Sequence, residues 1–406
     1  MGCVSSRAKS TDEYATAVDR TERTSGTALK FPNAIPLGST DGCYDLESSH
    51  VEPTINTAST DNDTSHSSLS SSTLTADLPV PSPTKPLSTT AAFATWINNL
   101  NEDPLLATVA IPYDCLLLQS SSRPTGIFGN VHRGTYQAMA VVVHRLDASK
   151  INERRLRIFK DDIYLLMRLQ HPNIVQFIGA SWTAPPTSSS ACCCLVMEYP
   201  QRGDLYSMLR SPKYKLTWQK NLLRIAMDVA AGMAYLHSCN PPVLHRELQS
   251  LHVHVTSNYV GKIADTASTP SQESSSGSRW MAPERILGEP YDGKADVYSF
   301  GILLSEMDTS KIPYEEMARH RPTKYTSMEK ATRASTELLR RITTEGLRPQ
   351  MAVHGLATVR SLFTRCVSVD PMERPTFEEI VTFLKHDVQD EINVRFPSTS
   401  GLFWPT

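Results

Sequence analysis

The hydrophobic positions divide the chain into a long polar part and a patterned part. From Lys9 to about Thr90 the sequence is rich in serine and threonine, poor in aromatic residues and without an apolar period. Such a segment buries too little apolar surface to offset the entropy of ordering, so we predict a flexible, disordered tether over residues 11–90. Its proline-rich stretch from Leu78 to Pro86 favours polyproline II and fits either a stiff linker or a PxxP ligand.

The patterned part begins with an amphipathic helix. Its apolar residues follow the i, i+3, i+4, i+7 spacing at Phe93, Trp96, Ile97 and Leu100. We expect a short helical extension over residues 91–111 that packs on the part that follows. Beyond it, short apolar runs precede long helical periods, which predicts strands first and helices afterwards. The predicted strands are Gly126–Val131, Gly134–Tyr136, Met139–Leu146 and Leu195–Glu198, and the first long helix is Phe159–Leu169.

Composition and charge exclude several classes of protein. Lysine and arginine total 40 against 42 acidic residues, and the net charge of −2 comes without a basic arm, so we expect no nucleic-acid partner. The eight cysteines lack the paired spacings of zinc sites and the density of a disulfide scaffold, which indicates a reducing compartment. No apolar run approaches the roughly 18 residues of a spanning helix, so any membrane contact must come through lipid.

The first residues match the pattern for N-myristoylation. Gly2 follows a removable methionine, Ser6 occupies the Ser/Thr position, and Cys3 stands where a second acyl chain is commonly attached. One myristoyl group anchors a protein only marginally, and the basic residues up to Ser25 are balanced by acidic ones, so stable anchoring would depend on Cys3. We predict a lipidation signal over residues 1–10 and a position at the cytoplasmic face of a membrane, the plasma membrane above all. An unmodified start of the chain is the alternative.

A series of motifs follows in order along the patterned part. They are a glycine loop at Gly126 and Gly129, then His171–Val175, Leu195–Tyr199, Ala230–His237, His245–Val255, Lys262–Asp265, Trp280–Glu284, Asp296–Gly301 and Asp370–Thr376. With this series the chain resembles the protein kinases, most closely the tyrosine-kinase-like serine/threonine kinases. The resemblance implies an α+β, bilobal fold with a five-stranded N-lobe that carries one helix and a mostly helical C-lobe. We expect this kinase-like domain at residues 112–388 and a C-terminal tail at 389–406.

Several positions keep the residue that the family uses. By resemblance, Gly126, Gly129, Val131 and Met197 would bind nucleotide, and Asp265 would bind magnesium. Glu284 and Arg374 correspond to the family's buried ion pair, and Asp296 to the residue that braces the backbone of the catalytic loop. Arg246 corresponds to the arginine that docks a phosphate on the activation loop. We therefore expect regulatory phosphorylation among Ser268, Thr269, Ser271, Ser274, Ser275, Ser276 and Ser278, unless these residues merely solvate a flexible connection.

Other positions depart from the family at the chemical groups themselves. They are Pro124 for the first glycine, His144 for the phosphate-binding lysine, Asp162 for its glutamate partner, Glu247 for the aspartate base, Gln249 for the loop lysine, His252 for the magnesium-binding asparagine and Thr266 for the phenylalanine after Asp265. Val142 also replaces a small alanine beside the adenine. A histidine at its ordinary pKa of about 6.5 is mostly neutral at pH 7. A base that is displaced by about 1 Å can lose about 10²-fold in rate.

These departures predict a catalytically impaired pseudokinase that serves as a membrane-tethered signalling scaffold or as the allosteric partner of an active kinase. The alternative is a weakly active serine/threonine kinase that transfers the γ-phosphate of ATP with the help of Mg²⁺. His252 and His254 also allow a zinc or manganese site together with Asp265, although histidines on a strand more often pack at its rim.

Overall fold

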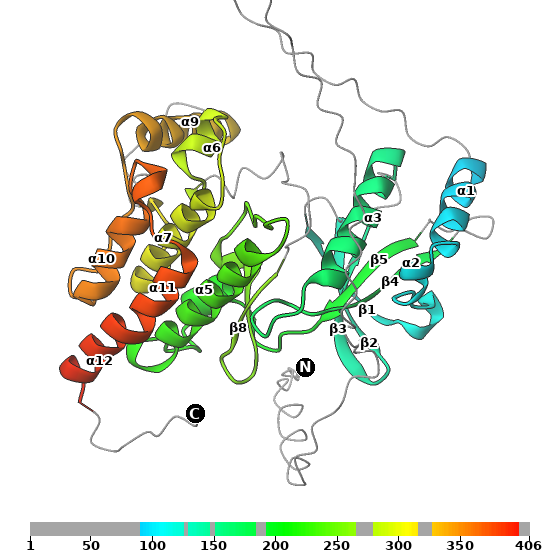
Figure 1. Ribbon diagram of the computed structural model, residues 1–406, viewed down its shortest axis with the longest axis horizontal. Helices are drawn as coiled ribbons and strands as arrows, with labels where there is room; N and C mark the ends of the chain where they lie inside the picture. Colours follow the sequence, from blue (N-terminus) through cyan, green and yellow to red (C-terminus); the bar gives the residue numbers. More distant parts are fainter. Residues whose placement is uncertain are drawn as a thin grey trace, which may run out of the picture. The chain divides into compact units, whose positions relative to one another are not determined.

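The computed structural model describes residues 90–125, 129–146, 151–183, 192–264, 279–315 and 327–397, all within the compact unit Pro79–Thr406 (Figure 1). The predicted lipidation signal and tether lie outside these residues, apart from Thr90. Within the described ranges, no helix has the length and apolar character needed to cross a bilayer.

An antiparallel five-stranded sheet forms the first half of the described chain. Its strands pair in the order β1-β2-β3-β5-β4. They are β1 (Leu117–Thr125), β2 (Gly129–Tyr136), β3 (Met139–Arg145), β4 (Phe177–Thr183) and β5 (Cys192–Glu198). The sequence predicts a turn between Val131 and Gly134, but β2 runs unbroken from Gly129 to Tyr136, because it pairs with β3 at every residue from Asn130 to Tyr136.

A long helix, α3 (Glu153–Arg168), lies beside this sheet, and Figure 1 shows it against β4 and β5. It begins earlier than Phe159, where the apolar pattern placed it, because the side chain of Asn152 accepts a hydrogen bond from the backbone N–H of Arg155 and caps the first turn. Its buried stripe consists of Leu156, Phe159, Ile163 and Leu166.

The region of the predicted amphipathic extension contains α1 (Thr90–Asn101), which is followed by α2 (Pro104–Ala107) and a 3₁₀ turn at Tyr113–Cys115. Phe93, Ile97 and Leu100 are buried in one cluster with Leu156 and Phe159 of α3. The extension therefore shares a hydrophobic core with α3 and the sheet.

The second half of the described chain is mostly helical, as the kinase resemblance implies. Its helices are α4 (Leu205–Arg210), α5 (Leu223–Ser238), α6 (Pro283–Leu287), α7 (Lys294–Thr309), α9 (Ser327–Thr344), α10 (Ala357–Cys366), α11 (Phe377–Phe383) and α12 (Gln389–Arg395). Shorter elements are the strands β6 (Gly203–Asp204), β7 (Val253–Val255) and β8 (Gly261–Ile263), 3₁₀ turns at Ser250–His252 and Pro371–Glu373, and π-helical turns at Trp218–Leu222 and Leu384–Val388. One large apolar core joins α5, α7, α10 and α11.

The helical part continues past residue 388, where the sequence predicts that a tail begins. Helix α12 follows directly and buries Ile392 in the large core. Glu391 of this helix accepts hydrogen bonds from the backbone N–H groups of Ala357 and Thr358, at 2.9 and 2.8 Å, and so caps the start of α10.

Candidate functional site

The register of the sheet gathers the predicted nucleotide residues on one face. Val131, His144 and Leu195 lie directly opposite one another across β2, β3 and β5, and the neighbouring row consists of Arg133, Val142 and Met197. Directly opposite residues point to the same side of a sheet, as do residues two apart on one strand. Both rows therefore share one face.

This face points toward α3. Leu195 and Met197 are buried in the cluster that contains Phe159 and Ile163 of α3, whereas Val141 and Val143 are buried in a separate cluster beneath the sheet. On the helix side, Asp162 is 1% exposed, so the residue in the glutamate position is a buried carboxylate on α3.

The backbone of the catalytic loop is held by one buried carboxylate. Asp296 Oδ2 accepts from the N–H of His245 at 2.9 Å, and Oδ1 accepts from the N–H of Arg246 at 2.8 Å. His237 Nε2 lies 3.0 Å from Oδ2. Burial raises the pKa of Asp296, but the hydrogen bond from His237 and the charges of His245 and His237 outweigh it, so the pKa lies below its usual range. The anion that holds the loop is thus stable at neutral pH.

Two histidines close the loop internally. His252 Nδ1 donates to the carbonyl of Glu247 at 2.8 Å, and His245 Nε2 donates to the carbonyl of Ala264 at 2.9 Å, since a carbonyl can only accept. The N–H of Ala264 in turn donates to the carbonyl of His252 at 2.8 Å. Ala264, the residue before Asp265, is therefore held to the loop through both its backbone N–H and its backbone carbonyl.

The remaining loop residues differ in exposure. Gln249 is buried, while Glu247 and Arg246 are partly exposed. Arg246 has a positive φ of 67°, and its carbonyl accepts a hydrogen bond from the guanidinium of Arg285. Left-handed backbone is uncommon for a residue with a side chain, and the contacts to Asp296 and Arg285 hold it in place.

Several predicted site residues lie outside the described residues. They are Gly2, Cys3, Gly126, Asp265, Thr266 and the serines and threonines of Ser268–Ser278, while Gly129 and the backbone of Pro124 lie on the paired ends of β2 and β1. Among the described residues, no cluster of three or more His, Cys, Asp or Glu side chains is arranged to hold a metal ion. The hypothetical metal site of His252, His254 and Asp265 therefore has its third residue outside the described part.

The residues of the predicted buried ion pair meet in the helical part. Arg374 donates to both carboxylate oxygens of Glu284, at 2.6 and 3.0 Å, and both side chains are buried. The guanidinium of Arg374 also donates to the carbonyls of Lys294 and Ser368, so each of its three nitrogens makes a hydrogen bond.

A further buried carboxylate, that of Glu306, is not among the residues predicted from the sequence. It accepts from Ser250 in the catalytic loop at 2.6 Å, from Arg210 of α4 at 2.8 Å and from the indole of Trp280 at 3.1 Å. Burial raises the pKa of Glu306, and the contacts to Ser250 and Arg210 oppose this effect. The available signal was a charged residue inside the almost wholly apolar run of α7.

A further missed contact joins the sheet to the small sheet of β6, β7 and β8. Lys262 Nζ lies 2.6 Å from Glu198 Oε1 at the end of β5, and the same oxygen accepts from the N–H of Gln176 at 2.8 Å. Ile174 and Ile263 also form a parallel bridge. These contacts tie the strand that leads to Asp265 to the end of β5.

Comparison with known proteins decides the family. A family model described as protein tyrosine and serine/threonine kinase matches residues 122–384. The chain belongs to this kinase family. Proteins of the family generally bind ATP and Mg²⁺. The resemblance inferred from the motifs is thereby confirmed.

Relatives in the family carry serine/threonine-kinase names. The probable serine/threonine-protein kinase drkB of Dictyostelium discoideum is 34% identical over 266 residues, which are 64% of this chain and 35% of that protein. The serine/threonine-protein kinases STY17 and CTR1 of Arabidopsis thaliana are 32% and 35% identical over 65% and 64% of this chain, and 43% and 30% of their own lengths. The chain thus spans less than half of these relatives.

Proposed function

We propose that this kinase-family protein is attached to a membrane through acylated Gly2 and Cys3, transfers phosphate poorly, and acts by binding a protein partner such as an active kinase. The observation that carries the proposal is a contrast within one loop. The backbone frame is complete, with Asp296 bonded to two successive N–H groups, while the side chains at Glu247 and His252 differ from those that do the chemistry in the family.

The nucleotide face supports the same conclusion. His144 stands in the row between Val131 and Leu195, where the family has a lysine for the phosphates. An imidazole is shorter than a lysine stem and carries less charge at neutral pH. Phosphate transfer depends almost entirely on positioning and charge stabilisation, so the loss of this cation reduces the rate directly.

Residual serine/threonine phosphotransfer is the second candidate function, and two observations favour it. The relatives are named serine/threonine kinases, and the sequence retains Asp265 after a strand that is fixed to the catalytic loop through Ala264. Glu247 retains a carboxylate at the position of the base, which a small shift of the loop would bring to the substrate hydroxyl.

The deciding experiment is transfer of radiolabelled phosphate from ATP by the full chain, with Mg²⁺ or Mn²⁺, to itself and to generic substrates. The matched variant carries His144→Lys, Glu247→Asp and His252→Asn. We expect near-background transfer by the natural chain and a clear rise in the variant. Robust transfer by the natural chain that disappears in Asp265→Ala would establish the second candidate instead.

Membrane attachment is tested separately. Gly2→Ala is expected to move the protein from the membrane to the soluble fraction, because myristoylation needs that glycine. Cys3→Ser is expected to do so nearly as fully, since one acyl chain binds only marginally and no basic patch compensates. Ser5→Ala is the matched control, and membrane association that survives both variants would refute the lipid anchor.

A further inference from the structure

A shallow groove of about 580 Å³ runs along the outer face of α10 and the loop before it. Its lining includes Val353, Gly355, Ala357, Arg360, Ser361 and Thr364. The opposite face of α10 is buried through Val359, Leu362, Phe363 and Cys366. The groove is therefore a surface feature of the helical core and separate from the catalytic loop.

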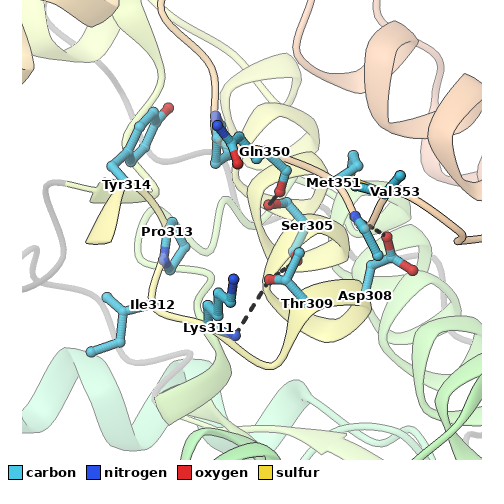
Figure 2. Close-up of a pocket in the computed structure, with 12 residues that line it drawn as sticks. Ser305, Asp308, Thr309, Lys311, Ile312, Pro313, Tyr314, Gln350, Met351 and Val353 are labelled. Carbon is cyan, nitrogen blue, oxygen red and sulfur yellow. Dashed lines mark hydrogen bonds between the residues drawn. The ribbon is translucent and has the colours of Figure 1, made fainter. Parts of the chain in front are cut away.

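The groove lining combines the apolar side chain of Val353 with the small residues Gly355, Ala357 and Ser361. Val353 is 81% exposed and lies in the lining of the groove. Figure 2 shows Val353 on the loop that Asp308 holds, and Asp308 Oδ2 accepts from the N–H of Ala352 at 2.8 Å. Val353 is thus presented to solvent from a fixed backbone.

Arg360 adds a cation with a fixed orientation. Its Nη2 donates to the carbonyls of Ala352 and Val353, at 2.7 and 3.2 Å. Hydrogen bonds at the edge of a guanidinium leave its planar face suited to an aromatic ring, and tryptophan is the best partner for such a contact. The groove therefore suits a peptide with both aliphatic and aromatic side chains.

The chain itself delivers such a peptide to this place. Arg395, at the end of α12, donates to the carbonyls of Gly355 and His354 at 2.9 and 3.0 Å, so the last described turn is fixed at the mouth of the groove. The sequence then continues from Pro397 through Ser-Thr-Ser-Gly to Leu402-Phe403-Trp404 without a single charge.

We propose that Leu402, Phe403 and Trp404 of the same chain occupy this groove. The seven residues from Pro397 to Phe403 are joined by six Cα–Cα steps and reach at most about 20 Å, and α10 is about 15 Å long, so the segment can lie along the whole helix. The short connection gives a local concentration in the millimolar range, which favours the chain's own segment over a separate partner.

The contacts follow from the chemistry of both sides. Leu402 and Phe403 cover Val353 and the small residues of α10, and Trp404 stacks on Arg360. Three large apolar side chains next to one another are costly to leave in water, and the groove removes them from it. The docked segment fastens α10 and the preceding loop to α12.

The test is hydrogen–deuterium exchange of residues 353–364 in the full chain. The first variant replaces Leu402, Phe403 and Trp404 by serine, and its control replaces Ser398, Thr399 and Ser400 by alanine. A segment docked nine-tenths of the time slows opening of the covered backbone about ten-fold, so the first variant should exchange about ten-fold faster and its control should match the natural chain.

A change on the groove side keeps the test independent of the tail. Ser361→Glu places a carboxylate beneath the ring of Phe403, so the rest of residues 353–364 should exchange faster, as in the serine variant. Gln219→Glu, on a distant exposed turn, should leave this exchange unchanged. Unchanged exchange in the serine variant would overturn the proposal. Protection that grows with protein concentration would assign the groove to a second copy and overturn it too. So would loss of binding to phosphatidylserine vesicles with unchanged exchange, because the segment would then contact lipid.

Discussion

The extension that precedes the matched kinase residues should stabilise the whole fold, and Leu100→Ala tests this. The family model begins at residue 122, yet Leu100 in α1 is only 1% exposed and packs in the cluster that contains Phe159 of α3. Two polar contacts fasten the same region. The indole N–H of Trp182 donates to Asn101 at 2.8 Å, and Asp103 accepts a hydrogen bond from the hydroxyl of Tyr164 of α3.

The magnitude follows from burial. Replacing a fully buried leucine by alanine removes its transfer free energy and leaves a cavity, which costs about 2–5 kcal/mol. We take about 2–4 kcal/mol here, the lower part of that range. Against a total stability of about 5–15 kcal/mol this is a large fraction. At roughly 2–3 °C per kcal/mol for a domain of this size, the melting temperature should fall by about 4–12 °C.

Urea denaturation and thermal melting of the full chain measure the effect. Asn98→Ala in the exposed face of the same helix is the control, and it should change stability by less than about 0.5 kcal/mol. The urea midpoint of Leu100→Ala should fall with an unchanged slope. If both variants melt together, or if Leu100→Ala accelerates hydrogen exchange only within α1, then the extension is an independent appendage and the reasoning fails.

Three further predictions concern the helical part. Glu284→Gln should cost about 3–5 kcal/mol in urea denaturation because it strands a buried arginine, whereas exposed Glu289→Gln should cost little. Iodoacetamide at pH 7.5 should label exposed Cys115 and spare Cys366, because burial raises the pKa of that thiol to about 12; equal labelling by mass spectrometry would contradict this. The pKa of Glu391 is lowered in the folded protein, so its ionised carboxylate stabilises the fold at pH values above its unfolded pKa of about 4.3. The difference in unfolding free energy between the natural chain and Glu391→Gln should therefore vanish as the pH falls through the folded pKa. A difference that stays constant with pH would refute the cap.

Periodicity in the sequence was enough to predict the elements whose packing is local. Phe93, Ile97 and Leu100 form one stripe of α1, and the structure buries all three. The start of α3 was hidden because its first turn is charged and its signal is a polar cap at Asn152 rather than an apolar residue. Propensity and period describe the middle of a helix better than its ends.

The contacts that build the site depend on residues far apart in the chain, and no local pattern contains them. The row of Val131, His144 and Leu195 arises from strand register, which is fixed by pairing across the whole sheet. The motifs placed Asp296 against the backbone of the loop that contains Glu247 through the family resemblance alone. Glu306 could have been suspected from its apolar surroundings, but its three partners come from three separate elements.

The hydrogen bonds of the catalytic loop indicate that the variant His144→Lys, Glu247→Asp, His252→Asn tests the chemistry of the site rather than its folding. His252 closes the catalytic loop by donating from Nδ1 to the carbonyl of Glu247, and an asparagine amide at this position also carries an N–H donor. Glu247 takes part in the loop through its backbone N–H and carbonyl, which Glu247→Asp leaves unchanged. The frame held by Asp296 is therefore kept when the family's side chains are returned. A restored variant that melts like the natural chain but still fails to transfer phosphate would place the defect at the departures that the variant leaves untouched, which are Pro124, Val142, Asp162, Gln249 and Thr266.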